Sequence, residues 1–413
     1  MAFGTMSVDY EIRVDYDRLR RERLEKAKAQ LAKSGMGAFL CFDTNNIRYI
    51  TSTYIGEWSR DKMERYCVLP RGGDPTLFEL GSAAKVRRMF SPWLGDRIEQ
   101  SESWSRSTVP TEFGQVQKVA QQVKRLLREH SVEHEPLGVD LLDVPLLKAL
   151  QAEQIEIADG MEQMLEARLI KTDDEIALLK IAASMVDATY RHIVEQLKPG
   201  LRESDVVAIA HDRLYRMGSD LVECVNVVSG ERTNPHPHLF TDRTIRPGEM
   251  VFIDVMQCFN GYRTCYYRTF NVGRPSKVQR QIYDQAWAWL KKAIELTKPG
   301  VTTADVCKVW PTAQELGLRD EREAYFLEFG HGIGLSHRER PMISRLYSLD
   351  HPVTIQKNMV LALETYCGSP DRKHGARIEE EVVVTEDGCE VITGYPCEEL
   401  VCTWLPGMEG GTR

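Results

Sequence analysis

The pattern of apolar positions divides the first part of the chain into a helix followed by short strands. Apolar residues recur every three or four positions over residues 14–33, which predicts an amphipathic helix. The apolar run 37–42 predicts a short buried strand, and the runs 66–70 and 76–80, separated by a segment containing Gly-Gly-Asp, predict a hairpin. This alternation predicts an α/β domain over residues 10–160.

The second part of the chain repeats itself weakly after one hundred residues. A long helix is predicted to begin at the capping signal Thr172–Glu175 and to end at Lys-Pro-Gly (198–200), and a second helix ends at Lys-Pro-Gly (298–300). Each is followed by a polar link, a shorter helix and a strand with small or polar residues, at 225–230 and 326–334. Two copies of this length are too few for a solenoid and favour duplication inside one domain.

Composition restricts the class of protein and its partners. The 413 residues are 42% apolar and 28% charged with a formal net charge of −8, which lacks the basic surplus typical of proteins that bind nucleic acid or anionic membranes. No apolar run approaches the roughly 20 residues that span a bilayer, and the charged N-terminus lacks the apolar core of a signal peptide. Ten cysteines without CxxC spacing indicate reduced thiols. We therefore expect a cytoplasmic enzyme with no nucleic-acid or membrane partner.

Four acidic or imidazole residues stand next to apolar or glycine-rich segments. Asp254 and Glu364 each end an apolar strand pattern, Glu379 stands at the entry of another, and His331 lies in a glycine-rich turn. A buried group of carboxylates is costly unless a cation, a proton or an arginine neutralises it. A hard metal ion with oxygen and imidazole ligands is one solution, and proton-sharing acid–base chemistry is another. Each residue alone is typical of a solvated surface, but the four together indicate a functional site.

These residues belong to a set of motifs that covers roughly residues 10–405 and resembles the superfamily of methionine aminopeptidase, prolidase, aminopeptidase P and creatinase. The matching segments are Glu249–Asp254, Gly261–Tyr262 with Arg268–Phe270, Gly330–Gly334, Met359–Glu364 and Arg377–Glu379. The resemblance implies an α/β fold of two domains: a creatinase-like N-terminal domain, and a C-terminal pita-bread domain with an internal duplication over residues 165–405. The peptidases of the family bind two divalent ions, and the resemblance assigns four of their five ligand positions to Asp254, His331, Glu364 and Glu379.

Two positions depart from this pattern and point away from peptidase action. The family's second aspartate, which bridges both metal ions, is replaced here by Cys265. The family's further histidine, seven residues after His331, is either retained as His337 through a one-residue deletion or replaced by Arg338. We therefore expect no cofactor, with one divalent ion of iron, manganese or zinc as the alternative.

The same resemblance supplies candidates for a base and for substrate recognition. Creatinase uses a histidine as general base without a metal, and His236 and His238 stand near the corresponding distance before Asp254. The segments Ser229–Pro235 and Phe42–Tyr49 resemble the dimethylsulfoniopropionate lyase branch, which uses iron. The residues that the resemblance places at the substrate are Trp58, Arg60, Arg65, Tyr262, His337 and Arg338. It also implies a homodimer in which residues of the N-terminal domain reach the partner's site.

Three functions follow from these observations. The first is an enzyme that cleaves a C–N or C–S bond in a small zwitterion or carboxylate, with His236 or His238 as base and Asp254, Glu364 and Glu379 holding the cationic part. The second is a metal-dependent Xaa-Pro dipeptidase or aminopeptidase, or a dimethylsulfoniopropionate-type lyase. The third is a catalytically silent binding module, which does not require four ligand-type residues. Metal analysis separates the first two, and a screen of small-molecule substrates separates both from the third.

Overall fold

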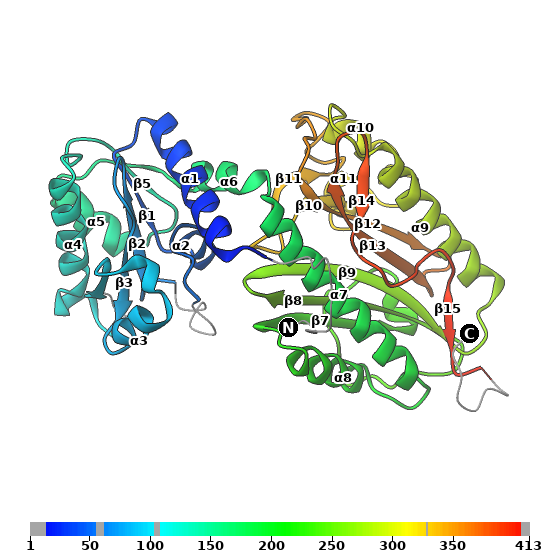
Figure 1. Ribbon diagram of the computed structural model, residues 1–413. Coiled ribbons are helices and arrows are strands. Elements are labelled where there is room, and N and C mark those ends of the chain that lie inside the picture. The colour runs from blue at the N-terminus through cyan, green and yellow to red at the C-terminus, as the bar shows by residue number, and fades with distance from the viewer. Residues whose placement is uncertain (1–13, 55–61, 103–107, 328, 406–413) are drawn as a thin grey trace, which may run out of the picture. The chain divides into compact units, whose positions relative to one another are not determined.

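The chain divides into two compact units. The structure, a computed structural model, describes residues 14–54, 62–102, 108–327 and 329–405. The division falls between Arg168 and Leu169, at the end of helix α6 (Met161–Leu169), where the sequence analysis expects one domain to end near 160 and the next to begin near 165 (Figure 1). No helix in these described ranges combines the length and the apolar character that crossing a membrane requires.

The N-terminal unit is built on one mixed sheet of six strands in the order β4-β3-β2-β1-β5-β6. Its strands are β1 (Ala38–Cys41), β2 (Tyr66–Pro70), β3 (Thr76–Leu80), β4 (Ile98–Ser101), β5 (Leu137–Val139) and β6 (Ile157–Asp159). Its other helices are α1 (Tyr16–Ser34), α2 (Thr44–Thr51), α3 (Ala83–Phe90), α4 (Gln115–Glu129) and α5 (Val144–Ala152). The expected first helix is confirmed as α1, and the expected hairpin is confirmed because β2 and β3 pair antiparallel.

A half-buried carboxylate fixes the turn between β1 and α2 in this unit. Asp140 accepts hydrogen bonds from the backbone N–H groups of Phe42 (2.8 Å) and Asp43 (3.1 Å) and from Asn46 Nδ2 (2.9 Å). Burial raises the pKa of Asp140 to about 6, although these donors act in the opposite direction. Asp43 in turn caps the N-terminus of α2 with its side chain. The three donors make Asp140 a structural anchor of the N-terminal unit.

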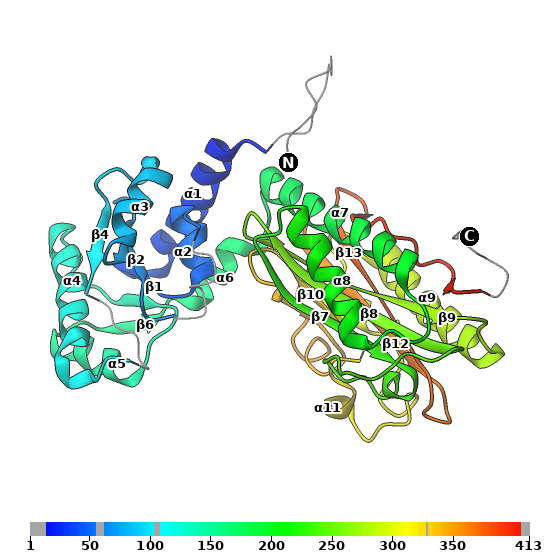
Figure 2. The same cartoon turned by 90° about the horizontal axis from the view of Figure 1, so that it is seen from below.

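The C-terminal unit contains two sheets, each covered by helices. The four-stranded sheet has the order β15-β9-β8-β7 and the five-stranded sheet the order β11-β10-β12-β13-β14. Helices α7 and α8 pack against β7, β8 and β9, and α9 packs against β12 and β13 (Figures 1 and 2). The helices are α7 (Asp173–Gln196), α8 (Glu203–Arg216), α9 (Lys277–Leu296), α10 (Thr303–Cys307) and α11 (Glu321–Ala324). The strands are β7 (Leu221–Ser229), β8 (Glu249–Phe259), β9 (Tyr262–Val272), β10 (Phe329–Gly332), β11 (Glu339–Ile343), β12 (Val360–Gly368), β13 (Gly375–Val384), β14 (Cys389–Val391) and β15 (Val401–Thr403).

The two Lys-Pro-Gly segments occupy corresponding places in the two halves of this unit. The N–H of Gly200 donates to the carbonyl oxygen of Ile245 at 3.0 Å, and the N–H of Gly300 donates to that of Ile355 at 3.0 Å. Each isoleucine N–H then donates to the residue after the glycine, at 2.8 Å in both copies. The same order of helix, turn, shorter helix and strand surrounds each pair, which supports the duplication expected from the sequence.

The expected ends of three strands and the expected turn at His331 are wrong in one consistent way. Asp254 lies in the middle of β8, Glu364 in β12 and Glu379 in β13, rather than at their ends, and His331 lies in strand β10 rather than in a turn. In β12 and β13, Glu364 and Glu379 are direct pairing partners, and the ladder continues on both sides of them. A polar residue ends an apolar run in the sequence, but it does not end a strand when its side chain is buried among other polar groups.

Candidate active site

The side chains expected to form the site come together between the two sheets of the C-terminal unit. Asp254 and Cys265 extend from β8 and β9 of one sheet, and His331, Glu364 and Glu379 extend from β10, β12 and β13 of the other. They form two overlapping groups, Asp254–Cys265–Glu379 and His331–Glu364–Glu379, in each of which one ligand-type atom per residue lies within 4.8 Å of the others. All five residues are buried. Glu379 belongs to both groups and is the centre of the site.

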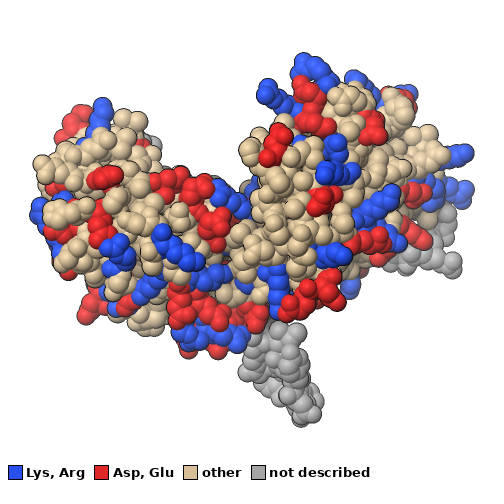
Figure 3. Space-filling model, turned by 90° about the horizontal axis from the view of Figure 1, so that it is seen from above, with Lys and Arg blue, Asp and Glu red and all other residues tan. Residues whose placement is uncertain are grey.

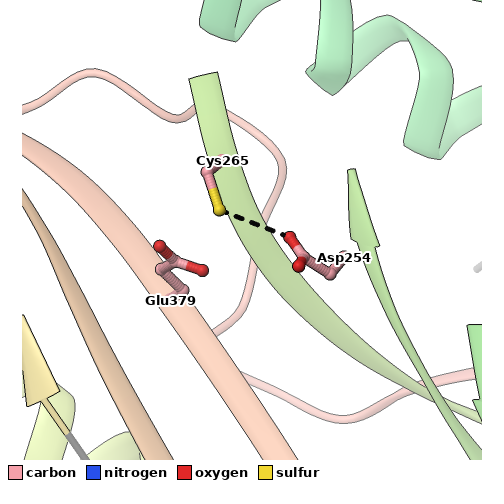
Figure 4. A group of neighbouring side chains, drawn as sticks. All are labelled: Asp254, Cys265 and Glu379. Carbon is pink, nitrogen blue, oxygen red and sulfur yellow. Dashed lines mark hydrogen bonds between the residues drawn. The ribbon is translucent and has the colours of Figure 1, made fainter. Parts of the chain in front are cut away.

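Asp254 is held by donors on both of its oxygens. Asn226 Nδ2 donates to Oδ2 at 3.1 Å, and the Cys265 thiol donates to Oδ1 at 3.6 Å (Figure 4). Burial raises the pKa of Asp254 to about 6 with a further contribution from Glu364, against the hydrogen bonds from Asn226 and Tyr267. Burial and the surrounding carboxylates also raise the pKa of the Cys265 thiol well above its usual value. Cys265 is therefore a protonated thiol next to Asp254.

Glu379, unlike Asp254, accepts no hydrogen bond from the described residues. Both of its carboxylate oxygens are buried, and neither has a hydrogen-bond partner among the described residues. Its carboxylate points toward Cys265 and Asp254 in Figure 4, without a hydrogen bond to either. Burial, followed by the charges of Glu364 and Asp254, raises the pKa of Glu379 well above its ordinary value. A buried carboxylate without donors is strongly unfavourable unless a proton or a cation neutralises it.

Glu364 lies between an arginine and a histidine. Arg377 Nη2 forms an ion pair with Glu364 Oε2, and His331 Nε2 lies 3.4 Å from Oε1. Burial acts to raise the pKa of Glu364, but the charges of Arg377 and His331 hold it below its ordinary value. His331 Nδ1 lies 2.8 Å from the carbonyl oxygen of Gly332, which can only accept, so Nδ1 carries a hydrogen. His331 Nε2 therefore faces Glu364 as a second proton site or as a metal ligand.

Arg377 was expected only as part of a motif, and its ion pair with Glu364 in the site was not predicted from the sequence. The residue is fully buried, and its guanidinium carbon lies 4.6 Å from the centre of the Tyr267 ring. Alternation along β13 could have indicated this place, because residues two apart on a strand share a face and Arg377 precedes Glu379 by two. Its positive charge is permanent, so it offsets one of the three buried carboxylates.

His236 and His238 lie beside the same arginine and tyrosine. The His236 ring stacks on Phe252 with a centroid distance of 4.7 Å, and the two imidazoles are 4.1 Å apart. Burial, reinforced by Arg377, lowers the pKa of His236 well below 6.5 and that of His238 to about 4. Both imidazoles are therefore neutral near pH 7 and able to accept a proton. Their role as base stays a prediction.

His337 and Arg338 have different surroundings. His337 Nδ1 lies 3.5 Å from Glu223 Oε2. The charges of His337 and Arg263 outweigh burial and lower the pKa of Glu223 to about 2. The exposed Arg338 places its guanidinium carbon 4.6 Å from the centre of the Phe326 ring, and that ring lies 6.3 Å from His238. Arg338, rather than His337, thus borders the histidine pair.

The remaining residues expected at the substrate are Trp58, Arg60, Arg65 and Tyr262. Trp58 and Arg60 lie outside the described residues. Arg65 is buried in the N-terminal unit, where its Nε pairs with Glu79 Oε1 at 3.0 Å, because the adjacent strands β2 and β3 bring the two side chains together. Tyr262 is also buried, and its hydroxyl donates to Glu175 Oε1 at 3.0 Å. Glu175 belongs to the capping box of α7, so Tyr262 joins β9 to that helix rather than facing a substrate.

The residues present fit a divalent metal ion on one side of the site. His331 Nε2 and the carboxylates of Glu364 and Glu379 offer one nitrogen and several oxygens, which suit zinc, iron or manganese. The unpartnered oxygens of Glu379 are the observation that requires a positive charge there. The group formed by Asp254, Cys265 and Glu379 fits less well, because a protonated thiol is not a ligand.

Known proteins with similar sequences and structures include hydrolases and a lyase. The Xaa-Pro dipeptidase of Pyrococcus furiosus is 30% identical over 231 residues, which cover 55% of this chain and 64% of that relative. The dimethylsulfoniopropionate lyase DddP of Roseovarius nubinhibens is 25% identical over 414 residues, which cover 96% of this chain and 90% of that relative. The solved Xaa-Pro dipeptidase of Bacillus anthracis superposes with a TM-score of 0.74 at 23% identity and covers 93% of this chain and 99% of its own.

These similarities confirm the expected superfamily and its two-domain pita-bread α/β fold. The solved dipeptidase matches nearly the whole chain, so both units take part in the shared fold. The profile of metallopeptidase family M24 matches residues 177–386, which include strands β7 to β13 and all five residues at the centre of the site. This match over half of the sequence shows that the chain belongs to metallopeptidase family M24.

Proposed function

We propose that this chain hydrolyses a C–N bond in a small carboxylate-bearing molecule at the group formed by His331, Glu364 and Glu379. The observation that carries this proposal is the buried Glu379 carboxylate, which has no hydrogen-bond partner among the described residues and lies next to two further carboxylates. A fold maintained only for binding or stability has no reason to keep such a charge, because it opposes folding. Strongly perturbed carboxylates gathered in one place are typical of catalytic sites.

The residues around Glu379 have separable roles. His331, Glu364 and Glu379 would hold a divalent ion, which supplies Lewis-acid polarisation of a carbonyl group and a more acidic bound water. Arg377 fixes the orientation of Glu364 through their ion pair. Glu379, whose two oxygens have no hydrogen-bond partner among the described residues, would take a proton from water and return it to the leaving nitrogen. His236 and His238, whose pKa values are lowered by burial and by the nearby Arg377, would serve as further proton acceptors in this proposal.

Arg338 supports a substrate that carries a carboxylate. Its guanidinium is exposed and lies against the Phe326 ring beside His238, where it could bind a carboxylate in bidentate fashion. The aromatic ring holds the guanidinium by a cation–π contact without consuming its hydrogen-bond donors. The proposed substrate therefore has its carboxylate at Arg338 and its scissile bond toward Glu379.

A lyase acting on a C–S bond is the second candidate. It is favoured by one observation, the relative DddP, whose alignment covers 96% of this chain, whereas the alignment with the Pyrococcus furiosus dipeptidase covers 55%. The two reactions differ in their products. Hydrolysis adds one water to the sum of the product masses, whereas elimination leaves that sum unchanged and creates a carbon–carbon double bond.

A substrate screen with product analysis by mass spectrometry tests both candidates. The panel consists of Xaa-Pro dipeptides, small zwitterions with a hydrolysable C–N bond, and dimethylsulfoniopropionate, each with and without added Mn²⁺. We expect one C–N compound to be hydrolysed by the wild type and not by the Glu379→Gln variant, while the variant of the exposed Glu399→Gln keeps full activity. Turnover of the sulfonium compound alone would establish the lyase, and no turnover of any compound would contradict both proposals.

A further inference from the structure

We infer that the site accommodates one divalent ion, held by His331, Glu364 and Glu379, and that the Asp254 side is closed to a second ion because Cys265 acts there as a hydrogen-bond donor. This inference deepens the proposed function and shares its site. It concerns the number of ions and their place, which binding measurements determine without any substrate.

The Asp254 side is closed by a chain of donors that leads away from the site. Cys224 Sγ donates to Asn226 Oδ1 at 3.2 Å, which fixes the amide so that its Nδ2 donates to Asp254 Oδ2 at 3.1 Å. The Cys265 thiol donates to Asp254 Oδ1 at 3.6 Å, on the other oxygen. In place of a hard carboxylate oxygen, Cys265 offers a soft sulfur, and its contact leaves both Asp254 oxygens with a hydrogen-bond partner. Asp254 is thus already satisfied by protein donors.

On the Glu379 side, by contrast, the carboxylate oxygens remain available to a metal ion. Neither oxygen of Glu379 has a hydrogen-bond partner in the part of the chain that the structure describes. His331 Nδ1 is used by the Gly332 carbonyl at 2.8 Å, which leaves Nε2 directed at Glu364 Oε1, 3.4 Å away. The carboxylate oxygens of Glu364 and Glu379 and the Nε2 atom of His331 lie in one buried group, and a positive charge between them would stabilise that group. The single His331–Glu364–Glu379 group meets that condition with nitrogen and oxygen ligands.

The count of charges also favours one ion. Asp254, Glu364 and Glu379 are the carboxylates of the two overlapping groups, and Arg377 forms a buried ion pair with Glu364. Three negative charges against one permanent positive charge leave two negative charges, which one divalent ion neutralises. A second divalent ion would leave two positive charges without counter-ions in a buried space, where repulsion is weakly screened. An aspartate at position 265 would supply part of the missing negative charge and a ligand oxygen.

Mn²⁺ binding to the full chain, stripped with chelator, tests this inference. Titration calorimetry and elemental analysis after gel filtration should find one Mn²⁺ per wild-type chain, and electron paramagnetic resonance should show the six-line signal of an isolated ion. Cys265→Asp should bind two ions, and their coupling should broaden that signal. Cys265→Ser is the matched control, because its hydroxyl still donates to Asp254, and it should bind one ion. Glu379→Gln should weaken Mn²⁺ binding at least about 100-fold.

The outcomes separate this inference from the proposed function. Two ions on the wild type, no ion, or a Cys265→Asp variant that melts like the wild type and still binds one ion would each overturn the inference. Full loading with one ion and no turnover of any C–N compound would overturn the proposed function and leave the inference standing. Turnover of such a compound by a wild type that the titration shows to bind two ions or none would overturn the inference and leave the proposed hydrolysis standing.

Discussion

A half-buried carboxylate in the N-terminal unit and a fully buried one in the C-terminal unit show how a structural acid differs from a functional one. Asp140 in the N-terminal unit accepts three hydrogen bonds, two from backbone N–H groups and one from Asn46. Glu379 in the C-terminal unit is fully buried, whereas Asp140 is only half-buried, and yet Glu379 accepts none from the described residues. Burial raises the pKa of both. The number of donors therefore distinguishes them: Asp140 stabilises a turn, whereas Glu379 is kept ready for a cation, a proton or a substrate.

The sharpest test of this comparison is Glu379→Gln. Loss of the charge should lower kcat/KM by at least about 1000-fold, or about 4 kcal/mol of transition-state stabilisation. The melting temperature should not fall, because the variant removes a buried charge that has no partner. Steady-state kinetics and thermal unfolding of the same preparation measure both effects. A destabilised variant with nearly normal kcat/KM would place Glu379 with Asp140 as a structural residue.

His331→Ala is expected to have the next largest effect. The imidazole is either a metal ligand or an acid–base group, so kcat/KM should fall several hundred-fold while circular dichroism shows a folded protein. Retention of more than about one tenth of wild-type kcat/KM, a loss below about 1.4 kcal/mol, would rule out both roles. The exposed His351→Ala serves as the control for the general effect of removing an imidazole.

Asp140→Ala should lower stability and leave activity nearly unchanged, whereas Glu379→Gln should lower activity and leave stability unchanged. Three buried donors lose their acceptor, so the free energy of unfolding should fall by about 3 kcal/mol. The kcat/KM of the folded fraction should stay within about threefold of the wild type, because the residue anchors a turn. Urea unfolding followed by circular dichroism gives the first quantity and active-site titration the second. Lost activity without lost stability would contradict the structural role.

The pKa of Asp140 predicts a pH dependence of stability. Its folded-state pKa of about 6 lies above the ordinary 3.8, so the protonated carboxyl favours the folded state. This contribution is complete below about pH 4 and is lost as the pH rises through about 6, which amounts to about 3 kcal/mol in full, of which about 1.3 kcal/mol is lost between pH 5 and pH 7. The difference in unfolding free energy between wild type and Asp140→Asn, measured at pH 5 and pH 7, isolates it. A difference that does not change with pH would mean that Asp140 is already ionised at pH 5.

The smallest expected effect is at the edge of the site. Arg338→Ala should raise KM about tenfold for a carboxylate substrate and leave kcat nearly unchanged, because the guanidinium binds a part of the substrate that does not react. The matching amide analogue, which lacks the carboxylate charge, should show the same KM with wild type and variant. An equal change for both compounds would indicate that Arg338 shapes the loop instead of binding the carboxylate.

Local patterns were sufficient to predict several elements of the fold. The capping box at Thr172 and Glu175 is confirmed at the start of α7, because a cap depends on residues three positions apart. The hairpin of β2 and β3 is confirmed for the same reason, since its turn lies between the two strands. The strands that carry the site were misplaced at their ends, because their extent depends on pairing with distant strands.

The sequence by itself determined which residue types are available at the site: three carboxylates, an imidazole and a cysteine in the order of a known family, with the cysteine where that family has an aspartate. Only the tertiary structure decided what each of them does. Cys265 and Asn226 reach Asp254 because β7, β8 and β9 pair in one register, and Arg377 reaches Glu364 because β12 pairs with β13. Glu379 has no donor because the facing sheet presents a thiol and a carboxylate to it (Figure 4). The sequence has 61 acidic and 53 basic residues, and on the face shown in Figure 3 the two signs are interspersed.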